Sequence, residues 1–239
     1  MGRIVLLTGA RGGIGSELLA QLVDDPTVEH VFATGRLPTA SQCERVTWLT
    51  LDLRATPSIQ SAAQRLADTT KRIDWFISAT GLLHEGAIQP EKRLDQIDPE
   101  TLDLVYRVNA SGPLALLGAC MPLLKTSTEP KVAVLSAQIG SIGDNRSGGW
   151  SAYRMAKAAL NMGLKNAAIE AARWRHPGTV VAVHPGTTLT NLSEPYVARR
   201  KQPVREAAVT ARLIAERIVS IDTSDNGRFM TAEGQPLPW

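Results

Sequence analysis

Short apolar runs alternate along this chain with stretches in which apolar residues recur every three or four positions. The short runs predict buried strands at residues 4–7, 28–34, 46–51, 73–78, 131–136, 179–184 and 227–231. The helical spacing predicts a helix after residue 13 and further helices over residues 59–66, 98–124, 151–173 and 204–219. Strands separated by helices form βαβ units. We therefore expect an α/β fold, with one doubly wound, mostly parallel sheet of about seven strands and helices on both faces.

The helix predicted over residues 98–124 carries its own boundary signals. Asp98 suits the N-cap, and Pro99 suits the first helical position. Gly112 and Pro113 stand inside the helix, where a proline removes a backbone donor and predicts a kink.

The composition indicates a soluble globular protein. The 239 residues fit a single domain over residues 1–239, because no repeat, low-complexity tract or linker divides them. Hydrophobic residues at 44% and charged residues at 21% are ordinary values. The net charge of +3 comes from scattered lysines and arginines, and aromatic residues reach only 5%, so nucleic-acid binding is not indicated.

Neither a membrane location nor a metal site is expected. No apolar run reaches membrane-spanning length, and glycines interrupt the N-terminal one, so a signal segment is not predicted. Cys43 and Cys120 lie in unlike contexts and predict no disulfide framework, which favours the reducing cytoplasm. The four histidines include no pair at the spacing of metal ligands.

A glycine-rich segment at residues 8–15 joins the first strand to the first helix. Missing side chains let a diphosphate approach the backbone, and the helix N-terminus offers N–H donors and a positive dipole end. A glycine-rich turn without a ligand is the alternative, but strand, glycines and helix in this order favour nucleotide binding. The residues expected to contact the nucleotide are Gly9, Arg11, Gly13, Ile14 and Gly15.

The residue after the second strand bears on which nucleotide binds. An acidic residue usually accepts a hydrogen bond from a ribose 2′-hydroxyl there, but this chain has Arg36, with Arg11 in the glycine loop. A guanidinium suits a 2′-phosphate, so NADP(H) is favoured over NAD(H). The alternative is that Arg36 is an exposed loop charge.

Tyr153 and Lys157 stand four residues apart and share one face of their predicted helix. Such pairs arise by chance, but this one follows the fifth strand of a dinucleotide-binding pattern. A neighbouring ammonium and a cationic nicotinamide ring would lower the phenol pKa from its usual ~10, so that Tyr153 could exchange a proton near neutral pH.

The spacing Thr-Gly-x-x-x-Gly-x-Gly from Thr8 and the Tyr-x-x-x-Lys pair resemble the short-chain dehydrogenase/reductase family over nearly the whole chain. The Gly-Ser-Ile-Gly-Asp-Asn and Gly-Gly-Trp-Ser-Ala-Tyr-Arg stretches and the ending Glu-Gly-Gln-Pro-Leu-Pro-Trp are similar to its C-factor-like and sniffer-like carbonyl reductases. The resemblance implies a Rossmann fold, a small-molecule carbonyl or alcohol substrate, and a homodimer or homotetramer packed through the Tyr-bearing helix and its neighbour.

The resemblance also implies roles for further residues. Asp52 and Leu53 would flank the adenine, and Lys157 would donate to the nicotinamide ribose. Gly81 keeps the turn after the fourth strand, although Ser-Ala-Thr replaces the family's Asn-Asn-Ala before it. Asn109 would hold a water that links the lysine to solvent, unless it only bends its helix. The nicotinamide carboxamide would be met by the segment that carries Pro185, Gly186, Thr188 and Thr190.

The serine that orients the substrate oxygen in this family is displaced here. Its usual position is occupied by Ala137, with Ser136 before it and Ser141 in the following loop. Either hydroxyl could serve, and Ser136 is preferred. If neither does, Tyr153 carries the oxyanion alone and turnover should be slow.

We therefore expect an NADP(H)-dependent carbonyl reductase or alcohol dehydrogenase. The alternative is an NADP(H)-binding signalling or sensor protein with little turnover. The substrate would be enclosed by residues 82–97 and 189–203. In the first of these loops, His84 and Glu85 are expected to be solvated rather than to contact the substrate. Trp150 and Trp239 would line either a pocket or a subunit contact.

Overall fold

The computed structural model describes residues 2–37, 39–41, 43–197 and 204–239. The last six residues of the expected substrate loop, 198–203, lie outside the described part. Among the described residues no helix is long and apolar enough to cross a membrane.

Seven parallel strands form one sheet in the order β3-β2-β1-β4-β5-β6-β7. This confirms the predicted fold class and strand number. The strands are β1 (Arg3–Thr8), β2 (Val28–Gly35), β3 (Val46–Thr50), β4 (Trp75–Ser78), β5 (Lys131–Leu135), β6 (Thr179–His184) and β7 (Phe229–Thr231). The order reverses between β1 and β4, where Thr8 pairs with Ser78, and this is the point at which doubly wound sheets bind ligands.

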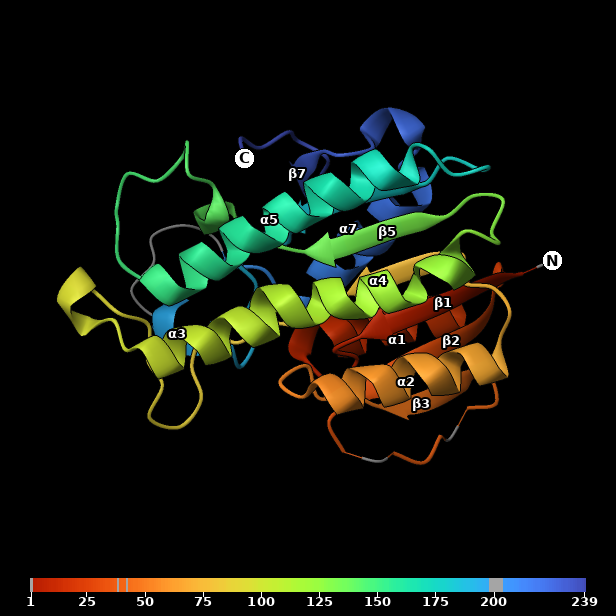
Figure 1. The fold of residues 1–239 in the computed structure, drawn as a ribbon, viewed down its shortest axis with the longest axis horizontal. Helices are drawn as coiled ribbons and strands as arrows, with labels where there is room; N and C mark the ends of the chain where they lie inside the picture. The colour runs from red at the N-terminus through yellow and green to blue at the C-terminus, as the bar shows by residue number, and fades with distance from the viewer. Residues whose placement is uncertain (1, 38, 42, 198–203) are drawn as a thin grey trace.

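Helices cover both faces of the sheet (Figure 1). One face is covered by α2 (Thr56–Thr69), α4 (Gly112–Leu124) and α5 (Ser151–Ala171), and the other by α1 (Gly13–Asp24) and α7 (Ala207–Ser220). Alternate strand residues serve the two cores, since Leu6 packs with the α4 and α5 side chains and Leu7 with those of α1 and α7. The remaining helical segments are η1 (Leu94–Gln96), α3 (Pro99–Tyr106), η2 (Arg107–Ser111), η3 (Gln138–Gly140), α6 (Glu194–Val197) and η4 (Thr223–Asp225).

The predicted kink in the helix of residues 98–124 takes the form of a π-helical turn. Asp98 caps α3 by accepting from the Thr101 N–H at 2.9 Å, as expected. The turn η2 then separates α3 from α4 one turn before Pro113. A side chain at Gly112 would lie 2.7 Å from the Arg107 carbonyl oxygen, so the glycine permits the tight passage beside this turn.

Candidate active site

The glycine loop lies at the carboxyl end of β1 and its backbone passes close to β4. Gly9 has a φ of +75°, and a Cβ there would lie 2.8 Å from the Ala79 carbonyl oxygen. A Cβ on Gly15 would lie only 2.0 Å from the Gly9 carbonyl oxygen. Gly12 caps α1 without a side-chain hydrogen bond. The loop is thus a cradle of bare backbone at a helix N-terminus, which fits a diphosphate.

The loop after β6 reaches the same glycine segment. A Cβ on Gly13 would lie 2.6 Å from Thr190 Cγ2, so the two loops are in direct contact. Thr188 is buried and its hydroxyl lies 2.8 Å from that of Thr210 on α7. Gly186 has a φ of +79° and lies against the Arg205 guanidinium, which donates to the Pro185 carbonyl oxygen at 3.3 Å. The structure therefore brings together both ends of the predicted cofactor site.

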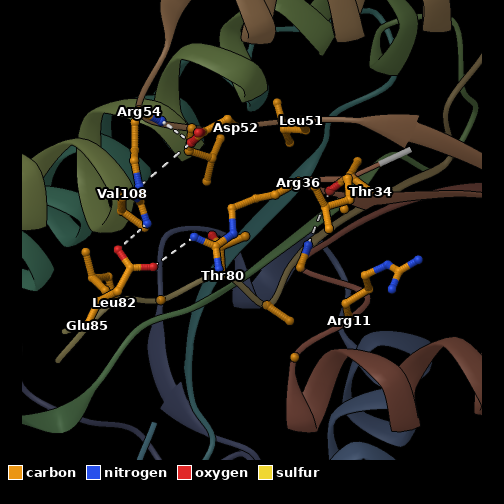
Figure 2. Close-up of a pocket in the computed structure, with 17 residues that line it drawn as sticks. Arg11, Thr34, Arg36, Leu51, Asp52, Arg54, Thr80, Leu82, Glu85 and Val108 are labelled. Carbon is orange, nitrogen blue, oxygen red and sulfur yellow. Dashed lines mark hydrogen bonds and ion pairs between the residues drawn. The ribbon is translucent and has the colours of Figure 1, made fainter. Parts of the chain in front are cut away.

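A pocket of about 380 Å³ opens between the ends of β1, β2, β3 and β4 (Figure 2). Six of the predicted cofactor residues line it: Gly9, Arg11, Arg36, Asp52, Leu53 and Gly81. Ile14 and the residues of the β6 loop do not line this pocket. Glycine backbone on one wall and arginines on the others fit an anionic dinucleotide.

Two pocket arginines are tied to one carboxylate. Arg36 Nη1 lies 2.9 Å from Glu85 Oε1, and Arg54 Nη2 lies 2.5 Å from Glu85 Oε2. The hydrogen bond from Arg36 and the charge of Arg54 hold the pKa of Glu85 below its ordinary value. The expectation that Glu85 is a solvated loop charge is therefore wrong. Arg11 instead stacks over the Trp48 ring, 5.3 Å from its centroid, and donates to Thr39.

The helix α5 places Tyr153 and Lys157 beside the end of β5. Lys157 is buried, and its Nζ donates to the Leu135 carbonyl oxygen at 3.0 Å. The same Nζ lies 5.7 Å from the Tyr153 ring centroid, so the pair shares one helix face as predicted. Burial lowers the pKa of Lys157 to about 7, because an ammonium loses hydration in this site.

Burial acts on Tyr153 in the opposite sense. It raises the pKa of the Tyr153 phenol above its ordinary value, because a phenolate would be poorly solvated there. The lowered pKa expected from the sequence is therefore wrong for the protein's own groups: desolvation of the phenolate outweighs the attraction of Lys157. The phenol keeps its proton at neutral pH.

Asn109 lies in the π-helical turn η2 and is fully buried. Its Oδ1 accepts from the Leu82 N–H at 3.0 Å, while its Nδ2 donates to the carbonyl oxygens of Leu82 at 2.7 Å and Val105 at 2.9 Å. The side chain thus fastens the loop after β4 to η2, next to Gly81, whose Cβ would lie 3.6 Å from Asn109 Oδ1.

The hydroxyls of both candidate serines are bound within the protein. Ser136 is buried, and its Oγ donates to Asn161 Oδ1 on α5 at 2.6 Å. Ser141 is also buried, and its Oγ donates to the Trp239 carbonyl oxygen at 3.0 Å. Ala137, at the usual serine position, carries no hydroxyl.

The two expected substrate loops meet through Tyr196. Its hydroxyl donates to Gln89 Oε1 at 3.1 Å, and its ring lies edge-on to His84 and Trp150, with centroids 5.7 and 5.0 Å away. His84 Nε2 also lies 3.1 Å from the Asn191 carbonyl oxygen. Trp150 therefore belongs to this loop contact, whereas Trp239 stacks on Phe229 with centroids 5.6 Å apart.

Sequence reasoning missed several residues of the pocket. Thr34, Leu51, Arg54, Thr80 and Val108 line it in addition to Glu85. Thr34 and Thr80 stand at strand ends, a position that could have singled them out, but nothing in the local sequence marks Arg54 or Val108. Within the described residues no group of three or more histidine, cysteine, aspartate or glutamate side chains is arranged to hold a metal ion.

Two curated relatives extend the sequence comparison. The chain is 27% identical over 241 residues to 1-hydroxy-2-glutathionyl-2-methyl-3-butene dehydrogenase of Rhodococcus sp. (strain AD45), covering 98% of this chain and 99% of the relative. It is 31% identical over 147 residues to C-signal of Myxococcus xanthus, covering 61% of this chain and 83% of the relative.

Solved structures share the fold over the full length. The carbonyl reductase Sniffer of D. melanogaster superposes with a TM-score of 0.86 at 22% identity, covering all of both chains. An NADPH-bound carbonyl reductase from chicken fatty liver superposes with a TM-score of 0.85 at 23% identity, covering 100% of this chain and 94% of that one. Residues 3–201 match the short chain dehydrogenase family, and the chain therefore belongs to that family.

Proposed function

We propose that this chain is an NADP(H)-dependent carbonyl reductase or alcohol dehydrogenase that acts on a small-molecule substrate. The observation that carries the proposal is the Tyr153–Lys157 pair, held beside the end of β5 by the Lys157 hydrogen bond to the Leu135 carbonyl oxygen. The glycine cradle lies at the end of β1 on the same edge of the sheet. The carbonyl reductases of similar fold, one of them NADPH-bound, support the same chemistry.

The residues that would hold the cofactor follow from the geometry. The backbone at Gly9, Gly13 and Gly15 would take the diphosphate, and Arg36 would take the 2′-phosphate. When bound, NADPH supplies the hydride for reduction of a carbonyl carbon. The contact between Gly13 and Thr190 supports a site that is continuous from the glycine loop to the β6 loop.

In this proposal Tyr153 gives its proton to the substrate oxygen during reduction. The raised pKa of Tyr153 keeps the phenol protonated at neutral pH, as a general acid requires. Lys157, with its pKa lowered to about 7, would be partly protonated at the same pH and could return a proton to the phenolate. Ser136 would orient the oxygen only if its hydroxyl left Asn161.

The alternative is an NADP(H)-binding sensor or signalling protein with little turnover. It is favoured by Ala137 at the serine position and by the internal hydrogen bonds of Ser136 and Ser141. The two functions differ in turnover and not in binding, so both measurements are needed.

The test is titration of the purified protein with NADPH and NADH, followed by NADPH oxidation with aldehydes, ketones and diketones. Tighter binding of NADPH together with turnover would support the reductase. Tight binding without turnover across the panel would favour the sensor. If neither nucleotide bound, both functions would be rejected, and with them the cofactor role of the glycine loop.

We also propose that residues 1–239 act as one catalytic unit that forms a homo-oligomer through α5. Met155, Met162 and Ile169 recur every seven residues on this helix and are 52%, 64% and 48% exposed. Both cysteines are free, which supports a cytoplasmic location.

A further inference from the structure

The carboxylate of Glu85 is shared between two arginines of the cofactor pocket. Its Oε1 lies 2.9 Å from Arg36 Nη1 and its Oε2 lies 2.5 Å from Arg54 Nη2, so each oxygen has its own guanidinium. The three residues come from different parts of the chain: Arg36 follows β2, Arg54 follows β3, and Glu85 lies in the loop after β4.

This bridge spans the pocket rather than its rim. All three residues line it, and Arg36 extends from the end of β2 across the pocket toward Glu85 on the opposite side (Figure 2). The Arg36 side chain is nevertheless 63% exposed, against 38% for Glu85 and 31% for Arg54. Arg36 is therefore open to a ligand while one of its donors is held by an internal anion.

We propose that Glu85 is a specificity-determining residue that competes with the 2′-phosphate of NADP(H) for Arg36; this inference rests on the proposed function. The donor that Arg36 gives to Glu85 is unavailable to a phosphate, and a carboxylate beside that phosphate repels it. Glu85 thus weakens NADP(H) binding and leaves binding of NAD(H), which lacks this phosphate, nearly unchanged.

Arg54 keeps the competing carboxylate in place. Arg54 also lies 3.9 Å from Asp52 Oδ1, and it is the least exposed member of the bridge. Arg11 takes no part, because its guanidinium is stacked over Trp48. Release of Arg36 therefore leaves Glu85 on Arg54, so the bridge can open on one side without leaving the carboxylate unpaired.

The experiment compares Glu85→Gln with Asp95→Asn by calorimetric titration of the full chain with NADPH and NADH. Asp95 is the matched control, since it lies in the same loop, pairs with Arg93 at 2.9 Å and does not line the pocket. Glu85→Gln should bind NADPH about threefold to tenfold more tightly and NADH within about twofold of the wild type. Asp95→Asn should change neither affinity by more than about twofold.

A second pair of variants assigns the effect to Arg36. In an Arg36→Gln background, Glu85→Gln should no longer tighten NADPH binding, because no guanidinium remains to be released. Tightening that persists in this background would overturn the competition.

The outcomes separate this inference from the proposed function. Wild type that binds NADPH, with an unchanged affinity in Glu85→Gln, overturns the inference alone. Weaker NADH binding in Glu85→Gln would also overturn it, by showing that the carboxylate serves the ribose. Absence of NADPH binding in both proteins rejects the proposed function and the inference together, whereas binding in Glu85→Gln alone would support the competition.

Discussion

At the scale of single residues, the glycine loop depends on backbone contacts that leave no room for a side chain. A Cβ on Gly15 would overlap the Gly9 carbonyl oxygen at 2.0 Å, so Gly15→Ala must shift the turn. We expect it to lower the free energy of unfolding by about 1–3 kcal/mol, the range for overpacked sites, and to weaken NADPH binding. Urea titration and nucleotide titration measure the two effects.

Gly118 provides the matched control for this substitution. It lies exposed in the middle of α4, and a Cβ there would meet nothing within 4 Å. Gly118→Ala should therefore stabilise the protein by about 0.4–1 kcal/mol, because alanine loses less backbone entropy on folding. Equal effects of the two substitutions would show that the close contact at Gly15 does not constrain the loop.

The lowered pKa of Lys157 makes stability depend on pH. Its pKa falls from 10.5 to about 7, so between these values the unfolded chain binds more protons and stability rises with pH. We expect the free energy of unfolding of the wild type, relative to Lys157→Met, to increase by about 2 kcal/mol from pH 7 to pH 9. Urea titrations at the two pH values measure it, and a constant difference would show that Lys157 is not desolvated.

The sequence identified residues whose role depends on local spacing. Tyr153 and Lys157 are one helical turn apart, and the glycines of residues 8–15 carry their own conformational signal. Glu85 was misjudged, because its partners Arg36 and Arg54 are 49 and 31 residues away in sequence. The pKa of Tyr153 was misjudged for a related reason: a spacing pattern reveals the neighbouring charge but not the depth of burial.

At the scale of elements, Arg154 fastens the loop before α5. Its guanidinium donates to the carbonyl oxygens of Gly149 at 2.8 Å, Ile139 at 3.0 Å and Gly148 at 3.2 Å. Hydrogen bonds from a charged donor contribute about 1.5–3 kcal/mol. Arg154→Ala should therefore speed amide hydrogen exchange across residues 139–149 about tenfold or more.

Arg146 is the control for that measurement. It is exposed and its side chain reaches only the Asn145 carbonyl oxygen, at 3.4 Å. Arg146→Ala should leave exchange in this loop unchanged. If Arg154→Ala did the same, the loop would be held by its backbone alone.

Element boundaries followed from the sequence wherever a physical signal marks them. The strand β6 was predicted at its observed residues, because a continuous apolar run is bounded by turn residues. The interruption near Gly112 and Pro113 was predicted, but not its π-helical form, which depends on the packing of Gly112 against Arg107 and Leu53. The short helix α6 has no periodic signal of its own and was missed.

At the scale of the whole molecule, the parallel sheet gathers every candidate site residue at one edge. The exposed apolar residues of α5 lie apart from that edge and predict self-association. We expect a dimer or tetramer by light scattering, and Met155→Lys with Met162→Lys should shift it toward monomer by placing charges in the contact. Leu94→Lys, at a 77% exposed position on η1, should leave the assembly intact. A wild-type monomer would reject the interface.

The most direct test of the account compares Tyr153→Phe with Tyr106→Phe for NADPH affinity and for turnover with a carbonyl substrate. Tyr106 is the control, because it is a half-exposed tyrosine at the end of α3. The account predicts that Tyr153→Phe binds NADPH within about threefold of the wild type but loses about 10²–10⁴-fold in kcat, because only the proton donor is removed. Tyr106→Phe should retain both properties. Turnover in Tyr153→Phe that stays within tenfold of the wild type would contradict the assignment of Tyr153 as the proton donor.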